Sequence, residues 1–411
     1  MSFSYQNNEL VCDGVAVAEI TARAGTPCYL YSARQLRENF GAYQRVFCDA
    51  EATICFAVKA CSNIAILKLL GAEGAGADTV SAGEIRRSLL AGIATEKIIF
   101  SGVGKTMEEI AFALESGIGQ LNVESREEVA IVNEIAAARN VKAKISVRVN
   151  PDVDAGTHEK ISTGRKADKF GIPWPEVWAT YQEARNLSYL EVEGVACHIG
   201  SQITELAPFK AAFAKVTELA RQLVADGFRL RRVDLGGGLG IRYRDEVALG
   251  ISDYAEAVME YVRPLGLRLF LEPGRSIAAS AGALIAQVQF VKHAEGKSFV
   301  VLDAGMNDLA RPAIYGAYHE IIPVRHGETA ESYDIVGPVC ESSDIFGTNR
   351  RLPSLESGDL IAILDAGAYG AAMSSNYNTR SLPPEILVEG DQFKIIRERQ
   401  RFEDIIALER Y

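Results

Sequence analysis

The sequence predicts a (β/α)8 barrel of the TIM type joined to a second, all-β domain. Strand-like and helix-like segments alternate eight times between residue 53 and about residue 275. From about residue 278 the pattern changes to strand-like runs separated by turn residues. The length of 411 residues exceeds one ordinary core but accommodates a barrel of about 250 residues and a second domain.

Short runs of apolar and β-branched residues predict the barrel strands. These runs span residues 53–60, 76–80, 97–102, 118–123, 143–150, 192–200, 231–238 and 268–275. Helical patterns such as SAGEIRRSLLAGI and SREEVAIVNEIAAARN lie between them. A doubly wound sheet has about six strands, so the count favours a barrel. The connection at 151–172 is unusually long, and we expect it to act as a lid at the active-site face.

The segments on either side of the barrel predict the second domain. GTPCYLYS near the N-terminus predicts a strand before a helix that begins near Ser32. Later strand-like runs include AGALIAQVQFVKHA, SFVVLDAG, SYDIVGPVC and DLIAILDAGAYG. We therefore predict a barrel domain at residues 30–277 and a β-sandwich-like or barrel-like domain built from residues 1–29 and 278–411.

Composition excludes several classes of function. The 43 basic and 54 acidic residues give a net charge of -11, which argues against nucleic-acid and anionic-lipid partners. The seven cysteines show no CxxC spacing, so neither a disulfide framework nor a metal site is indicated, and a cytoplasmic location is expected. No signal-peptide pattern and no apolar run of about 18 residues is present, so we expect no membrane span.

Chemically distinctive residues fall at the C-terminal ends of the predicted strands, where barrels carry their active sites. They are Lys59, Asp78, His198 with Ser201, Gly236–Gly238, and Glu272 with Arg275. A lysine at a strand end can simply cap the strand and reach solvent. An ε-amine held in a partly dry site is instead a nucleophile near neutral pH and can form a Schiff base.

The residues around this lysine predict a phosphorylated, ring-shaped cofactor. The three glycines can form a tight turn, but after strand seven of a barrel their bare N–H groups suit a phosphate. His198 is either a core histidine or a ring stacked on a flat cofactor. Glu272 follows the apolar run LFL, where a carboxylate needs a partner such as a pyridine nitrogen. Lysine, phosphate site and acidic partner together indicate pyridoxal 5'-phosphate.

Eight segments resemble the diaminopimelate decarboxylase family, which belongs to the alanine-racemase-like, fold type III class of pyridoxal phosphate enzymes. They are FAVKACSN, GADTVSAGE, HIGSQI, DLGGGLGI, EPGR, DAGMNDLARPAIYGAYHEI, GPVCESSDIF and DAGAYGAAMSSNYN. The resemblance extends from about residue 25 to the C-terminus. Several segments also resemble decarboxylases of ornithine and arginine, but NDLARPAIYGAYHEI and AMSSNYN indicate the diaminopimelate branch.

The resemblance implies a role for each matching residue. Lys59 would hold the cofactor as a Schiff base, His198 would stack on its ring, and Glu272 would face its nitrogen. The implied cofactor-binding residues are Lys59, Asp78, His198, Ser201, Gly236, Gly237, Gly238, Glu272, Pro273, Gly274, Arg275 and Tyr377. Arg275, Arg311 and Tyr315 would take the distal carboxylate of the substrate, and Glu341 its distal ammonium. Tyr377 would close over the phosphate and is also implied in substrate binding. Cys340 would donate the proton, so the implied catalytic residues are Lys59 and Cys340.

The family active site is shared between two subunits, which implies a homodimer. The segment Cys340–Asp344 would come from the partner chain. The β-domain would thus supply substrate and dimer contacts. The implied reaction is decarboxylation of meso-2,6-diaminopimelate to L-lysine and carbon dioxide, the last step of lysine biosynthesis.

Elementary chemistry agrees with these roles without requiring them. Decarboxylation leaves a carbanion, which a protonated ring delocalises and an acid such as a thiol then protonates. An isolated cysteine is more often an inert core residue, although Glu341 beside Cys340 argues against an apolar setting. Arg311 could be a surface cation, but Arg275 and Arg311 suit a substrate with a second carboxylate.

Three other functions stay open at this stage. The first is decarboxylation of another basic amino acid or a carboxylated polyamine, such as ornithine, arginine or carboxynorspermidine. The second is a racemase, which needs a second base opposite Lys59 that no motif supplies. The third is a silent cofactor carrier, which loss of Cys340, Glu341 or the arginines would favour; all of them are present.

Overall fold

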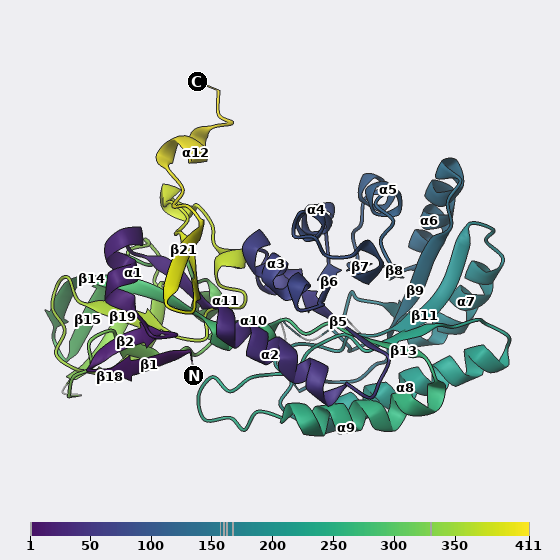
Figure 1. Cartoon of the computed structure of the whole chain (residues 1–411), viewed down its shortest axis with the longest axis horizontal. Coiled ribbons are helices and arrows are strands. Elements are labelled where there is room, and N and C mark those ends of the chain that lie inside the picture. The colour runs from purple at the N-terminus through teal and green to yellow at the C-terminus, as the bar shows by residue number, and fades with distance from the viewer. Residues whose placement is uncertain are drawn as a thin grey trace. The chain divides into compact units, whose positions relative to one another are not determined.

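The computed structural model describes residues 2–156, 158, 161, 163–166, 168–328 and 331–410, and the chain divides into two compact units (Figure 1). The barrel unit comprises Phe40–Arg242 and Val247–Ser276. The β unit comprises Met1–Asn39, Tyr243–Glu246 and Ile277–Tyr411. None of the helices in the described part of the chain has the length and apolar character that a membrane span requires.

A closed ring of parallel strands forms the barrel unit, as the alternating pattern predicts. In the described residues its members are β5 (Ala52–Ala57), β6 (Gly76–Thr79), β7 (Ile98–Phe100), β8 (Gln120–Val123), β9 (Ala143–Asn150), β11 (Leu190–Ala196), β12 (Arg232–Asp234) and β13 (Arg268–Leu271). Strand β13 pairs with β5 and β8 pairs with β9, which closes the ring. The short β10 (Ile172–Pro173) adds to β9 outside the ring. The predicted (β/α)8 barrel is therefore confirmed.

Helices connect the barrel strands and cover the ring. They are α2 (Ala33–Val46), α3 (Ile64–Ala72), α4 (Ala82–Leu90), α5 (Met107–Glu115), α6 (Arg126–Arg139), α7 (Val177–Arg185), α8 (Leu206–Ala225) and α9 (Ile251–Val262). Polar N-caps begin several of them: Ser81, Thr106 and Ser125 each accept a hydrogen bond from the backbone of the first turn. The strand-to-helix turns that carry candidate residues are thereby fixed at their helix ends.

The β unit is organised around the 13-residue strand β14 (Gly282–Ala294). It pairs with β4 (Cys28–Ser32), β15 (Lys297–Leu302) and β19 (Leu360–Ile363). Its other strands are β16 (Ile321–Pro323), β17 (Glu331–Val336), β18 (Ile345–Leu352), β20 (Glu385–Glu389) and β21 (Gln392–Arg397), with β1 (Phe3–Gln6), β2 (Glu9–Cys12) and β3 (Val15–Ala16) in a small separate sheet. Because β4 pairs with β14 and β20, the N- and C-terminal segments share one sheet, as predicted.

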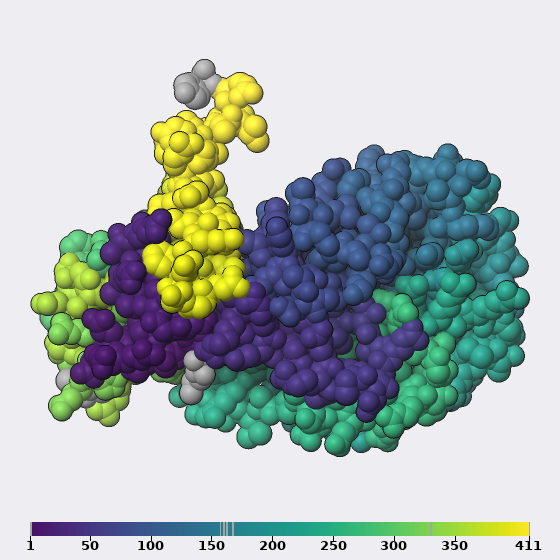
Figure 2. Space-filling view, viewed as in Figure 1, coloured from purple at the N-terminus to yellow at the C-terminus, as the bar shows by residue number. Residues whose placement is uncertain are grey.

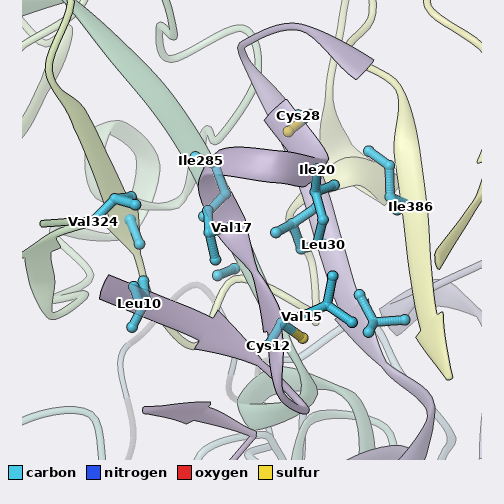
Figure 3. Packing of buried hydrophobic residues seen from close by; sticks show 13 residues of the cluster. Leu10, Cys12, Val15, Val17, Ile20, Cys28, Leu30, Ile285, Val324 and Ile386 are labelled. Carbon is cyan, nitrogen blue, oxygen red and sulfur yellow. The ribbon is translucent and has the colours of Figure 1, made fainter. Parts of the chain in front are cut away.

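The core of the β unit joins residues from both ends of the sequence. Figure 3 shows Leu30, Ile285, Val324 and Ile386 packed with residues of the first strands and of α1 (Val17–Ala24). Figure 2 shows the yellow C-terminal segment lying against the purple N-terminal segment, in agreement with the pairing of β20 with β4. Burial of these side chains stabilises the sheet by about 1.5–3 kcal/mol for each large one. Three short helices complete this unit or adjoin it: α10 (Arg275–Ala278), α11 (Arg311–Tyr315) and α12 (Phe402–Ile406).

In its described part, the long connection at 151–172, predicted as a lid, is held by hydrogen bonds within the barrel unit. Residues 157, 159, 160, 162 and 167 lie outside the described residues. In the described part, Val153 N–H donates to the Gly164 carbonyl at 2.8 Å and the Thr163 hydroxyl donates to the His198 carbonyl at 2.9 Å. Closure of this connection over a ligand stays a prediction.

Candidate active site

Lys59 lies just beyond β5, in the 3-10 turn Val58–Ala60. The predicted strand continued to residue 60, but β5 ends at Ala57, whose N–H donates to the Pro273 carbonyl at 3.1 Å. The Nζ atom of Lys59 donates to Oδ2 of Asp78 at 2.6 Å, and 38% of the lysine side chain stays exposed. The amine is thus held at the C-terminal end of the barrel strands and remains accessible to a ligand.

Three buried carboxylates lie at this end of the barrel: Asp78 in β6, Asp234 at the end of β12, and Glu272 after β13. Oδ1 of Asp234 accepts the Gly236 N–H at 3.0 Å. Burial raises the pKa of Asp234 to about 6, and the nearby charge of Asp78 adds to the shift. Burial, followed by the charges of Asp234 and Asp78, raises the pKa of Glu272 well above its usual range. A positive group beside Glu272 would offset this shift, because it favours the charged form of a carboxyl group.

Two carboxylate oxygens in this group have no hydrogen-bond donor among the described residues. They are Oε1 of Glu272 and Oδ1 of Asp78, and both are buried. A buried carboxylate oxygen without a donor costs free energy, and native structures contain few such atoms. The arrangement thus suits a ligand that brings its own N–H or cationic donor to Glu272.

The glycine segment after β12 brings backbone amides close to β13. Gly236 and Gly238 have φ values of +66° and +108°, which favour glycine. A Cβ added to Gly237 would lie less than 3.0 Å from the Glu272 carbonyl oxygen, which is closer than Cβ atoms pack in proteins. A Cβ added to Gly238 would lie 2.5 Å from the Gly200 carbonyl oxygen. The segment therefore leaves no space for side chains.

Ser201 and Arg275 add two further donors in the same unit. Nη2 of Arg275 donates to the Ser201 hydroxyl at 3.1 Å, which fixes both side chains. Arg275 is buried and begins α10, and Pro273 and Gly274 link that helix to β13. A guanidinium, a hydroxyl and glycine amides form a donor set suited to a phosphate dianion.

His198 follows β11 and is half-buried. Its Nδ1 accepts the Gly237 N–H at 3.1 Å, so the neutral ring carries its hydrogen on Nε2. Burial, followed by the charges of Arg148 and Lys59, lowers the pKa of His198 well below its usual range. A neutral imidazole fixed by a backbone amide presents a flat face on which an aromatic ring can stack.

The residues of the barrel unit fit pyridoxal 5'-phosphate. The fit depends on the donorless oxygen of Glu272, which suits a protonated pyridine nitrogen, and on the side-chain-free glycine segment, which suits the phosphate. Lys59 supplies the amine for the aldehyde. No group of three or more His, Cys, Asp or Glu that could hold a metal ion occurs among the described residues.

Sequence reasoning missed two residues of this site, Arg148 and Asp234. Arg148 lies in β9, where its Nη1 donates to Oε1 of Glu124 at 2.8 Å and its guanidinium lies 5.0 Å from the ring centre of Phe170. Its positive charge lowers the pKa of Glu272 as well as that of His198. A charged residue within the apolar run ISVRVN was the available signal.

In the β unit, Arg311 and Tyr315 lie on the five-residue helix α11. Arg311 is buried, and its Nη1 lies 2.7 Å from Nε2 of His319. Its guanidinium also lies 4.7 Å from the ring centre of Tyr243. The alternative of a surface cation is therefore wrong for Arg311. Its positive charge lowers the pKa of Asp365, which burial raises to about 6 overall.

Cys340, Glu341 and Tyr377 come together in the same unit. The Tyr377 hydroxyl donates to Oε1 of Glu341 at 2.6 Å, which raises the pKa of Tyr377. The Cys340 N–H donates to Oδ1 of Asn378 at 3.3 Å, and the cysteine is exposed. Asp344 accepts the N–H of Val339 at 2.7 Å and so fixes the loop that carries Cys340. An inert core role for Cys340 is excluded by its exposure.

Comparisons with known proteins give one consistent result. Residues 33–279 match the family model described as the pyridoxal-dependent decarboxylase, pyridoxal binding domain. The chain is 47% identical to a diaminopimelate decarboxylase of Pseudomonas aeruginosa, over 99% of this chain and 98% of that protein. It is 46% identical to one of Haemophilus influenzae, over 99% of each chain. 

Solved structures agree. The structure of diaminopimelate decarboxylase from Helicobacter pylori, complexed with L-lysine, matches with a TM-score of 0.93 and 44% identity over 95% of this chain and 98% of that chain. A diaminopimelate decarboxylase of M. jannaschii, in co-complex with L-lysine, matches with a TM-score of 0.95 and 38% identity over 100% of this chain and 98% of that chain.

Proposed function

Because the chain belongs to the diaminopimelate decarboxylase family of pyridoxal-dependent decarboxylases, we propose that it removes one carboxyl group of meso-2,6-diaminopimelate as carbon dioxide and leaves L-lysine. The observation that carries this proposal is the Lys59 amine, paired with Asp78 at the end of the barrel strands in the same unit as the buried, donorless oxygen of Glu272. An aldehyde-binding amine and an acid for a ring nitrogen are the two requirements of this cofactor.

Pyridoxal 5'-phosphate, when bound, supplies an electron sink for the carbanion that loss of carbon dioxide leaves. Lys59 would hold its aldehyde, and the Asp78 carboxylate, which accepts a hydrogen bond from Lys59, would orient that amine. Glu272 would accept the N–H of the ring nitrogen and keep the proton there. Gly236–Gly238, Ser201 and Arg275 would hold the phosphate, and the neutral imidazole of His198 would stack on the ring.

The residues of the β unit are proposed to recognise the substrate and complete the reaction. Arg311 and Tyr315, with Arg275, bind the distal carboxylate, and Glu341 with Tyr377 binds the distal ammonium. The Cys340 thiol donates the proton that forms the new C–H bond. A substrate without the distal carboxylate leaves these guanidinium groups unmatched, so turnover is specific for diaminopimelate. Tyr377 also closes over the phosphate in this proposal.

We further propose a homodimer in which Cys340–Asp344 of each chain serve the active site of the partner subunit. The exposure of Cys340 and the ordered loop held by Asp344 support a role in binding. The proposed location is the cytoplasm, a reducing compartment that suits seven free cysteines.

A substrate panel tests the proposed function. Carbon dioxide release is measured from meso-diaminopimelate, ornithine, arginine and lysine with purified, cofactor-loaded protein. Diaminopimelate should be decarboxylated with a kcat/KM at least about a hundredfold above the others, because two unmatched buried charges cost several kcal/mol. Equal or higher kcat/KM for ornithine or arginine would instead establish the alternative decarboxylase, and no release from any compound would establish a silent cofactor carrier.

A further inference from the structure

A network of buried polar side chains crosses the interior of the barrel and ends at Asp234. Nε2 of Gln120 donates to Oδ2 of Asp234 at 3.0 Å and to Oδ1 of Asn122 at 2.7 Å. Nδ2 of Asn122 donates to the Ser101 hydroxyl at 3.0 Å. Gln120 belongs to β8 and Asp234 to β12, and these strands are not neighbours in the ring. The Asp234 carboxylate is therefore held from the opposite side of the barrel.

Asp234 also contacts the residues that precede and include Glu272. Its Oδ1 accepts the Gly236 N–H at 3.0 Å, and the Gly236 carbonyl accepts the Glu272 N–H at 2.7 Å. In the sheet Asp234 pairs with Phe270, two residues before Glu272. The carboxyl groups of Asp234 and Glu272 are hydrogen-bonded to each other. Asp234 thus connects the network inside the barrel to the acid at its C-terminal end.

The bond between the two carboxyl groups determines how many protons they hold. An ionised carboxylate can only accept a hydrogen bond, so one of the two groups must carry a proton. Asp234 receives N–H donors on both oxygens, which favours its charged form. Oε1 of Glu272 is buried and receives no donor from the described residues, which favours the neutral form. The pair therefore holds one proton on Glu272 and one negative charge on Asp234.

We propose that Asp234 is a positioning residue for the cofactor, because its bond to one oxygen of Glu272 leaves the other oxygen fixed as the acceptor for the N–H of the ring nitrogen. This inference depends on the proposed function, in which Glu272 accepts that N–H. The single negative charge of the pair equals the single positive charge of a protonated pyridine ring. If the shared proton passes to Asp234, the O–H bond of Glu272 breaks, that of Asp234 forms, and the negative charge moves to Glu272 without proton exchange with water.

A cofactor analogue separates this role from the support that Asp234 gives to Gly236. 1-Deazapyridoxal 5'-phosphate keeps the aldehyde and the phosphate but has a C–H group in place of the ring nitrogen, so it offers no N–H to Glu272. Dissociation constants of both compounds are measured by absorbance titration of the cofactor-free protein. Their ratio, analogue over cofactor, reports the contact of the ring nitrogen. It should be at least about ten in the wild type, the effect of one charge-assisted hydrogen bond.

Four variants separate the contacts of the pair. Asp234→Leu has a similar shape and removes both the bond to Glu272 and the support of Gly236. Asp234→Asn keeps an NH2 group that can donate to Glu272. Glu272→Leu removes the acceptor for the ring. Glu128→Gln is the matched control, because Glu128 is a partly buried carboxylate of α6 that accepts from Nζ of Lys105 at 2.7 Å. Thermal unfolding shows which variants fold, and Asp234→Ala replaces Asp234→Leu if the latter does not.

Asp234→Leu should lower the ratio at least about fivefold, because Glu272 loses the bond that orients it. Asp234→Asn should keep the ratio within about threefold of the wild type. Both compounds should bind this variant more weakly, because one amide oxygen cannot replace the acceptors of Gly236 and Gln120. Glu128→Gln should leave the ratio unchanged. Equal weakening of both compounds by Asp234→Leu, or an equal fall of the ratio in the Leu and Asn variants, would overturn the positioning role.

Glu272→Leu separates this inference from the proposed function. It should bring the ratio to about one, because no acceptor remains for the ring N–H. A wild-type ratio near one, or an unchanged ratio in Glu272→Leu, would show that the assignment of Glu272 to the ring nitrogen is wrong. If Glu272→Leu acts as expected and Asp234→Leu leaves the ratio unchanged, the assignment of Glu272 holds and the inference about Asp234 is wrong.

Discussion

Replacement of Gly237 by alanine tests whether the glycine segment must lie directly against strand β13. A Cβ at this position would lie less than 3.0 Å from the Glu272 carbonyl oxygen, too close for two packed atoms. That oxygen belongs to the backbone and cannot rotate away. The two atoms must separate by roughly 1 Å to reach ordinary contact. Overpacking of this kind costs about 3 kcal/mol. The shift also moves the Gly237 N–H, which donates to His198, and the start of the Glu272 side chain.

Gly237→Ala should therefore lower the free energy of unfolding by about 3 kcal/mol and weaken binding of pyridoxal 5'-phosphate at least about tenfold. Urea unfolding of the cofactor-free protein and absorbance titration with the cofactor measure the two effects. Gly104→Ala is the matched control, because no heavy atom lies within 4 Å of its added Cβ; its stability should stay within about 0.5 kcal/mol of the wild type. Wild-type stability and cofactor affinity in Gly237→Ala would refute the steric reasoning.

Three further predictions concern the thiol, a buried acid and the dimer. Cys340→Ala should lose most decarboxylation yet bind cofactor normally, and unchanged carbon dioxide release would remove the thiol from the mechanism. Asp234 has a folded pKa of about 6, above its usual value near 3.9, so its stabilising contribution is full below about pH 4 and is lost as pH rises through 6. The wild type should therefore lose up to about 3 kcal/mol of unfolding free energy between pH 4 and 6 because of Asp234, and Asp234→Asn should not show this loss. Parallel plots of unfolding free energy against pH for the two proteins would show that Asp234 has an ordinary pKa. Inactive Lys59→Ala and Cys340→Ala chains, unfolded and refolded together, should recover about a quarter of wild-type activity, because half of the dimers are mixed and each mixed dimer has one intact site; no recovery would place both residues of a site in one chain.

The sequence predicted the barrel well because its evidence is local and repeated. The barrel strands have three to eight residues, most of them apolar, and helices follow them at regular intervals along the barrel unit. Few other folds fit such an alternation. Strand ends were less accurate, as at Lys59, because the strand stops where Ala57 bonds to the Pro273 carbonyl. That bond joins residues more than two hundred positions apart, and a local pattern contains no information about it.

The site residues whose type alone indicates their chemistry could be predicted from the sequence. Those whose chemistry depends on burial and on contacts with distant residues were missed. Lys59, Glu272 and the glycines are conspicuous in their strands, and the structure brings them into one unit. Asp234 looked like an ordinary residue before the glycines, but complete burial raises its pKa.

Chemical identification of the lysine that binds the cofactor tests the central claim most directly. The cofactor-loaded protein is reduced with borohydride, which makes the linkage permanent, and is then digested and mapped by mass spectrometry. We expect a yellow protein and one phosphopyridoxyl adduct, located on Lys59. An adduct on any other lysine, or no adduct in a protein that decarboxylates diaminopimelate, would contradict it.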